Sequence, residues 1–321
     1  MVRGDSTPPS DRDWAGERVW PHRIAAWNAG ATFLLILAGG LVTNTGSGLA
    51  VPDWPTTFGH NMFLYPWSKM VGGIFYEHSH RLLGAAVGLL TLALAVLLWV
   101  VEPRRWLRWL GAGALAAVMI QGILDGLRVV LLRDGLAIVH GVIAQTFLAL
   151  VASLALFTSR TWTRTSERAL PADAGHVDTL CLLITGLLYV QIVFGALLTH
   201  LGARFDVHLG TAVLISVLDG LLSVQVLRYR ASLPQLVRPT LLLGGLLVLQ
   251  LSLGLGAYLV RFTGVPMLLG QFSTLAFPVA HRLNGGLLLV TSLTLTLLTY
   301  RRLGWRQLGH GSGWAPKGVP A

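Results

Sequence analysis

The feature that most constrains this chain is a series of eight apolar stretches, each long enough to cross a lipid bilayer. The hydrocarbon core of a bilayer is about 30 Å thick, and a helix of about 20 apolar residues spans it. Eight such stretches exceed what one soluble core would bury, so the pattern predicts membrane-spanning helices. They cover residues 24–44, 80–101, 107–127, 137–158, 179–200, 208–227, 239–260 and 281–300.

The composition supports the same class. Of the 321 residues, 54% are hydrophobic and only 12% are charged, whereas soluble domains carry about 25% charged residues. The apolar stretches show no period-2 alternation of the kind that transmembrane barrels need. We therefore predict an all-α polytopic membrane protein with eight transmembrane helices.

The net charge of +10 would also suit a nucleic-acid-binding protein, but the distribution of the charges argues against that class. Most of the 24 Lys and Arg residues fall in alternate connecting segments, which lie on one side of an eight-helix chain. Cytoplasmic loops carry such an excess, so both termini are expected in the cytoplasm. The residues concerned are Arg3, Arg12, Arg18, Arg23, Arg104, Arg105, Arg108, Arg160, Arg164, Arg168, Arg228, Arg230, Arg238, Arg301, Arg302, Arg306 and Lys317.

A weak internal repeat divides the chain into two halves of four helices. Three stretches carry a glutamine followed by small residues, a turn, and a helix expected to start near a histidine. The glutamines are Gln121, Gln191 and Gln250. Because each half has an even number of helices, the halves share one topology, as in a parallel repeat. We expect a cytoplasmic tail (1–23), an N-terminal half (24–158), a cytoplasmic linker (159–178), a C-terminal half (179–300) and a second cytoplasmic tail (301–321).

Four histidines occupy equivalent places in this repeat. His80, His140, His208 and His281 each open an even-numbered stretch, so all four should lie near the outer face of the membrane. Imidazoles that face each other across a helix bundle can bind a haem iron from both sides. The repeat predicts two such sites, one formed by His80 with His140 and one by His208 with His281. A single histidine at a helix end could equally be a hydrogen-bonded interfacial residue.

Three charged residues accompany these histidines. Arg81 and Arg282 directly follow His80 and His281 and could bind haem propionates, or could extend to the membrane interface. Glu77 lies one helical turn before His80. A carboxylate there could move protons or stabilise positive charge during oxidation of a haem substituent, or could simply pair with Arg81 or Lys69. Glu77 predicts chemistry in the first half and a permanent cofactor in the second.

The remaining ionisable residues and the cysteine give weaker signals. The single cysteine, Cys181, is expected to be a small core residue. His60, His78 and His200 fit no repeat position and are interpreted as interfacial. Asp125 and Asp219 are the acids within apolar stretches, and neither has an evident partner in the sequence.

Together these residues resemble the heme A synthase family of membrane proteins, over about residues 24–300. The resemblance rests on the segment from Thr45 to Pro55, on Glu77-x-x-His80-Arg81, on Gln121-Gly122, and on His140, His208 and His281. It implies two pseudo-symmetric four-helix bundles in a bacterial inner membrane. It further implies that the N-terminal half binds heme O and oxidises its C8 methyl to a formyl group, which gives heme A for terminal oxidases.

The resemblance also assigns residues. It places Glu77, His80 and His140 at the substrate site, and His208 and His281 at a heme b site that serves electron transfer. Heme O synthase and oxidase assembly proteins are the implied partners, besides membrane lipid, and the electron donor stays open. Many family members carry a cysteine pair in the first outer loop, where this chain has Val51 and Thr57. Two alternatives remain: a bis-histidine dihaem electron-transfer cytochrome, and a haem carrier or oxidase assembly factor.

Overall fold

The computed structural model describes residues 19–132, 135–164, 176–263 and 270–303. Most of the two expected tails and most of the linker lie outside these ranges. So do the arginines within 1–18, 165–175 and 304–321. The described helices are α2 (Val19–Asn44), α3 (Gly73–Val101), α4 (Arg105–Leu131), α5 (Gly135–Thr158), α6 (Arg160–Arg164), α7 (Val177–Leu201), α8 (Phe205–Arg228), α9 (Pro234–Tyr258) and α10 (Gln271–Leu303). A π-helical turn, η3 (Leu259–Thr263), extends α9.

The eight predicted membrane spans are confirmed. All the described helices except α6 and the short turns are long and apolar enough to cross a bilayer. Within the described ranges the chain forms no strand, and Thr57 and His60 make one isolated bridge. The protein is therefore an all-α integral membrane protein.

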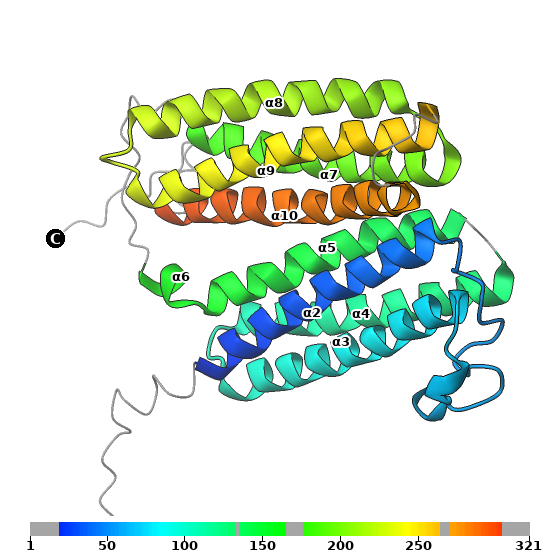
Figure 1. Ribbon diagram of the computed structural model, residues 1–321. Helices are drawn as coiled ribbons and strands as arrows, with labels where there is room; N and C mark the ends of the chain where they lie inside the picture. Colours follow the sequence, from blue (N-terminus) through cyan, green and yellow to red (C-terminus); the bar gives the residue numbers. More distant parts are fainter. Residues whose placement is uncertain (1–18, 133–134, 165–175, 264–269, 304–321) are drawn as a thin grey trace, which may run out of the picture.

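The helices form two four-helix bundles with the same order of contacts. In the first, α2 packs on α3, α3 on α4, α4 on α5, and α5 returns to α2. In the second, α7, α8, α9 and α10 close an equivalent ring. Figure 1 shows the bundles side by side, and α10 of the second contacts α2 and α5 of the first. The repeat thus pairs α2 with α7, α3 with α8, α4 with α9 and α5 with α10.

The two ends of the molecule differ in charge. The connections from α3 to α4 and from α8 to α9, together with α6, lie at one end (Figure 1). They carry Arg104, Arg105, Arg160, Arg164 and Arg230 among others. The long loop between α2 and α3 lies at the opposite end. This is the separation that the positive-inside pattern predicted.

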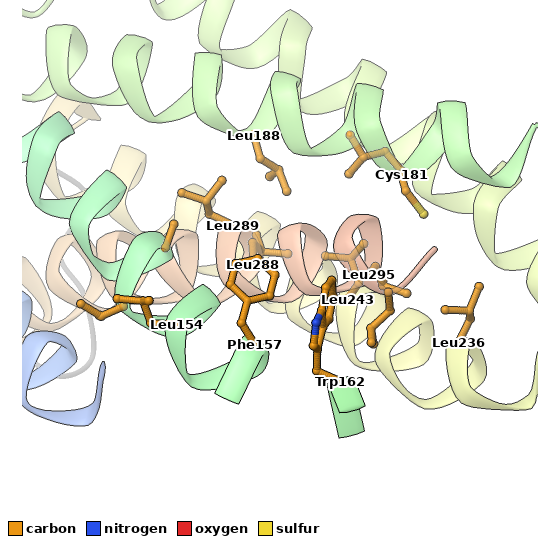
Figure 2. Packing of buried hydrophobic residues seen from close by; sticks show 14 of the residues in the cluster. Leu154, Phe157, Trp162, Cys181, Leu188, Leu236, Leu243, Leu288, Leu289 and Leu295 are labelled. Carbon is orange, nitrogen blue, oxygen red and sulfur yellow. The ribbon is translucent and has the colours of Figure 1, made fainter. Parts of the chain in front are cut away.

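One buried apolar cluster includes residues of both bundles and of α6. Phe157 at the end of α5 and Trp162 of α6 contact edge to face, with ring centroids 4.7 Å apart. They belong to one buried cluster with Leu243 of α9 and Leu295 of α10 (Figure 2). Cys181 is buried in the same cluster, as expected of a small core residue.

Two helices begin earlier than the apolar stretches predicted. Helix α3 starts at Gly73 rather than near residue 80, and α10 starts at Gln271 rather than near residue 281. The expectation that His80 and His281 open their helices was therefore wrong. Polar residues such as Glu77 and His78 continue a helix as well as apolar ones do, because the backbone hydrogen bonds are unaffected. Both histidines thus lie two or more turns inside a helix, where neighbouring helices can surround them.

Candidate haem sites in the two bundles

The structure brings the four histidines together in the predicted pairs. His80 of α3 faces His140 of α5 with ring centroids 6.3 Å apart, and His208 of α8 faces His281 of α10 at 6.2 Å. The interplanar angles, 69° and 64°, are also alike. A metal ion bound by both rings through bonds of about 2.0 Å would separate the centroids by roughly 6 Å. The spacing in each bundle therefore fits one metal ion between the two imidazoles.

The ring nitrogens differ in their surroundings. The Nδ1 atoms of His80, His140 and His208 are buried and make no hydrogen bond with a described residue. The fourth, Nδ1 of His281, lies 3.2 Å from the carbonyl oxygen of Gln250. A metal-bound histidine commonly directs its second ring nitrogen toward the protein in this way, which fixes the orientation of the ring. For His281, this leaves Nε2 as the ring nitrogen available to a metal ion.

The repeated glutamines hold the helices that carry the histidines. Gln121 Nε2 donates to the backbone carbonyl of His140 at 3.1 Å, and Gln191 Nε2 donates to that of His208 at 2.8 Å. The third, Gln250, lies 3.3 Å from Nε2 of His281 and accepts a hydrogen bond from Asn284 at 2.8 Å. Each glutamine thus joins its helix to the histidine-bearing helix that follows. The sequence predicted the repeat but not this contact.

Glycines on the preceding helices make room for three of the rings. A Cβ atom would lie 3.0 Å from the His80 ring at Gly39, 3.3 Å from His208 at Gly195, and 2.9 Å from His281 at Gly254. Two of these distances are at or below the closest approach that real side chains show, so the rings need glycine there. Residue 125 of α4 is the repeat equivalent of Gly254, and it is an aspartate.

Asp125 is correspondingly part of the N-terminal site. A carboxylate oxygen of Asp125, a nitrogen of His80 and a nitrogen of His140 all lie within 4.8 Å of one another. The expectation that Asp125 lacks a partner was therefore wrong, because the sequence does not show that α4 faces both α3 and α5. Asp219 of α8 is buried, and its Oδ1 makes no hydrogen bond with a described residue.

Glu77 is buried and held in one orientation. Its Oε1 accepts a hydrogen bond from Arg81 at 2.7 Å, and its Oε2 accepts one from the backbone N–H of Val51 at 2.9 Å. The residue is only 4% exposed. The ion pair with Arg81, which the sequence suggested as a purely structural role for Glu77, is present. Glu77 lies three residues, or about one helical turn, before His80. At the positions three residues before His208 and His281, the second bundle has Phe205 and Pro278.

Arg81 ties the loop between α2 and α3 to helix α3. Its guanidinium donates to the carbonyls of Asp53 at 2.7 Å, Thr56 at 3.2 Å and Val51 at 3.3 Å, in addition to Glu77. The loop also contacts α4, since Trp54 packs on Gly126 and the Arg128 guanidinium packs on Gly48. The loop residues that follow Thr45 therefore bridge α3 and α4 at the end of the bundle that holds Glu77.

Asp53 organises the tip of this loop. Its carboxylate accepts hydrogen bonds from the backbone N–H groups of Phe58 and Gly59, at 2.7 and 2.8 Å, and from the hydroxyl of Thr56. Burial is the largest single influence on the pKa of this carboxyl and would raise it. The hydrogen bonds from Gly59, Thr56 and Phe58 together outweigh burial and lower the pKa of Asp53 below its usual 3.8.

The two loop positions matched to the family's cysteine pair are both buried. Val51 donates its backbone N–H to Glu77, and the Thr57 hydroxyl lies 3.1 Å from Nδ1 of His78. The His78 ring also contacts Tyr65, with centroids 5.2 Å apart. The expectation that His78 is an interfacial residue was wrong, because the loop folds over this side of α3. These contacts hold the loop without a disulfide.

In the second bundle, Arg282 reaches across to the first. Its guanidinium donates to the hydroxyl of Thr43 on α2 at 3.2 Å. Arg282 therefore lies where the bundles meet, next to His281. The sequence gave no indication of this contact, since the two residues are far apart along the chain and belong to different halves.

Comparison with known proteins agrees with this arrangement. Residues 22–208 match the model of a family described as cytochrome oxidase assembly protein. A heme A synthase of Rhodopseudomonas palustris strain TIE-1 is 28% identical over 62% of this chain and 59% of its own length. A heme A synthase of Shouchella clausii is 27% identical over 87% of this chain and 94% of its own length.

The chain thus spans less than two thirds of the Rhodopseudomonas relative and nearly all of the Shouchella one. The family model covers more than half of the chain and includes Glu77, His80, His140 and His208. By this match, and with its eight spans and paired histidines, the chain belongs to the heme A synthase family of cytochrome oxidase assembly proteins.

Proposed function

We propose that this protein is a heme A synthase, an oxidoreductase that converts the C8 methyl of heme O to the formyl group of heme A. The observation that carries the proposal is the pairing of histidines in both bundles, at 6.3 and 6.2 Å, with an acid, Glu77, one helical turn before a histidine of the first pair alone. Family membership and the names of the relatives support it. The proposal places catalysis in the N-terminal half and electron transfer in the C-terminal half.

In the N-terminal half, His80 and His140 would hold the iron of heme O as substrate. Glu77 would act at the edge of the bound substrate, where a fixed carboxylate can accept a proton or stabilise positive charge as the methyl group is oxidised. Arg81 keeps the Glu77 carboxylate in place and holds the outer loop over the site. In this proposal Arg81 contributes to binding of the substrate chiefly by ordering these groups.

In the C-terminal half, His208 and His281 would bind a resident heme b, which supplies electron transfer. Both residues fit that role, since two imidazoles at this spacing suit a bis-histidine iron. Gln250 contacts Nε2 of His281 through a flexible amide, which can rotate away to free that atom. Arg282, beside His281, is the better placed of the two arginines to bind a propionate.

The proposal extends to the setting of the enzyme. It would lie in a bacterial inner membrane with both termini in the cytoplasm and both haem sites near the outer face. Heme O synthase and oxidase assembly proteins would be its partners, because heme O must be delivered and heme A passed on. The cationic end of the bundles, which carries Arg104 and Arg160, supports this orientation.

Extraction of haem from cells tests the proposal. The protein is co-expressed with a source of heme O, and the extracted haems are separated by chromatography. Wild type should yield heme A, and Glu77→Gln should yield heme O with heme A reduced by at least about 100-fold, the range seen when a group acting on a proton is removed. Glu102→Gln removes another buried glutamate, which pairs with Arg104 at the opposite end of α3 from Glu77, and should retain heme A.

Two results would contradict the proposal. If wild type accumulates bound haem but no heme A, the electron-transfer cytochrome becomes the better account. If Glu77→Gln makes heme A as fast as wild type, Glu77 has only the structural role of pairing with Arg81.

A further inference from the structure

The N-terminal site contains one more ligand group than a haem requires. A bis-histidine haem iron is bound by two imidazoles, which His80 and His140 would supply. The carboxylate of Asp125 also lies within 4.8 Å of a nitrogen of each histidine. Haem binding alone therefore does not account for Asp125.

The internal repeat shows that this carboxylate is a departure from the pattern of the chain. The equivalent places on α2, α7 and α9 are Gly39, Gly195 and Gly254, and each packs directly against a histidine ring. Helix α4 alone has an ionisable side chain there. Glycine is thus compatible with the backbone of this repeat, and aspartate adds a ligand that the second bundle lacks.

Two imidazoles and one carboxylate form a common site for divalent metal ions. This set binds iron(II) on one face and leaves other positions open, and it also suits cobalt(II) and zinc(II). The three ligand atoms already converge from three helices, α3, α4 and α5. Small side-chain rotations would bring them to bond distances of about 2.0–2.2 Å from one ion. All three residues are partly exposed, so an ion could reach them.

We propose that, in the absence of haem, His80, Asp125 and His140 bind one divalent transition-metal ion. The site would take iron(II), cobalt(II) or zinc(II), which favour imidazole ligands, over magnesium or calcium, which favour oxygen ligands. Metal ion and haem would compete for the same two histidines. The second bundle, with Gly254 at the position of Asp125, offers two imidazoles only and would bind such ions more weakly.

Two arginines lie near the site, and one of them is neutralised. Arg81 is neutralised by its ion pair with Glu77 at 2.7 Å. The Arg128 guanidinium lies one turn after Asp125 on α4 and packs on Gly48 of the loop. Asp125 thus supplies the negative charge at the site, while the neutral imidazoles provide most of the ligand bonds.

Titration with cobalt(II) tests the proposal, because its visible absorption reports nitrogen and oxygen ligands directly. The full-length protein is prepared without haem in detergent and titrated with cobalt chloride. Wild type should bind one equivalent with absorption bands of a four- or five-coordinate ion. Asp125→Gly, which restores the glycine of the other repeats, should weaken binding by at least about 100-fold, since even outer-sphere partners of metal ligands contribute 10- to 100-fold.

Matched variants separate this effect from general damage. Asp219→Asn removes a buried acid within a membrane span of the second bundle and should bind cobalt as wild type does. His208→Ala removes a ligand candidate of the second bundle and should also leave binding unchanged. Circular dichroism and gel filtration of each variant check that the helices and the monodisperse particle are retained.

Three outcomes would overturn the proposal: no saturable cobalt binding by wild type, equal binding by Asp125→Gly, or loss of binding in His208→Ala. This test requires no haem and no turnover. A negative result would leave the heme A synthase proposal standing, and a failure of heme A formation would leave the metal site standing.

Discussion

Three carboxylates at the end of the first bundle that carries the α2–α3 loop make different contacts, which define what each one does. Glu77 is fixed between Arg81 and the Val51 amide, and Asp125 lies beside both histidines. Asp53 instead accepts hydrogen bonds from its own loop. The loop is hydrogen-bonded to Arg81, which pairs with Glu77. A substitution of Asp53 should therefore affect Glu77 only by making the loop less ordered.

Replacing Asp53 should loosen the loop. Asp53→Asn keeps the shape of the side chain but removes the charge that strengthens the bonds from Phe58 and Gly59. If the substitution destabilises the closed loop by about 1 kcal/mol, the fraction of molecules with an open loop rises roughly fivefold. Lys69, exposed in the same loop, should then be cleaved by trypsin correspondingly faster, as peptide mass spectrometry would report. Equal cleavage rates would show that Asp53 does not hold the loop.

The lowered pKa of Asp53 gives this loop a pH dependence with a defined sign. The pKa of the Asp53 carboxyl is lower in the folded loop than in the unfolded one. At pH values well above the ordinary pKa of 3.8, the ionised carboxylate therefore stabilises the folded loop to its full extent. This contribution is lost as pH falls through the lower, folded value. Hydrogen exchange at Phe58 and Gly59 should therefore differ between wild type and Asp53→Asn at neutral pH, and the difference should vanish in acid. A difference that persists below both pKa values would contradict the assignment.

At the scale of helices, close approach between neighbours positions the histidine rings. Gly254 of α9 lies against the ring of His281, whereas Gly245 on the same helix faces open space. Gly254→Val would place a branched side chain where the ring lies, at an overpacking cost of about 1–3 kcal/mol. The haem-loaded variant should lose the low-spin signal of the second site, and Gly245→Val should keep it. Retention of both signals in Gly254→Val would show that the ring does not need this space.

The helices also show which features a sequence can reveal. Apolar length identified all eight spans, and the repeat identified the four histidines and their pairing. Apolar length did not locate the true start of α3 or α10, because polar residues beyond the apolar stretch extend a helix at little cost. Asp125 was detectable in principle, since aligning Gln121 with Gln250 places Asp125 opposite Gly254. Its nearness to His80 depends on how α3, α4 and α5 pack, which no local pattern encodes.

Across the whole molecule, the charge pattern predicts which end faces the cytoplasm. The chain has one cysteine, Cys181, which is buried, so Cys181→Ser provides a background for labelling. Ser68→Cys in the α2–α3 loop should react with a membrane-impermeant maleimide in intact cells. Ala231→Cys, in the exposed turn between α8 and α9, should react only after the cells are permeabilised. The reverse pattern would invert the orientation.

The two bundles are joined but carry separate sites. Arg282 bonds to Thr43 across the junction, and α10 packs on α2 and α5. Each histidine pair nevertheless comes from helices of one bundle. A ligand substitution in one bundle should therefore leave the iron site of the other intact.

Electron paramagnetic resonance of the oxidised, haem-loaded protein tests the paired histidines most directly. The account predicts two low-spin bis-histidine signals in wild type, with His80→Ala removing one and His208→Ala removing the other. A single signal lost in both variants, or low-spin signals that survive both substitutions, would show that these pairs do not bind two haem irons.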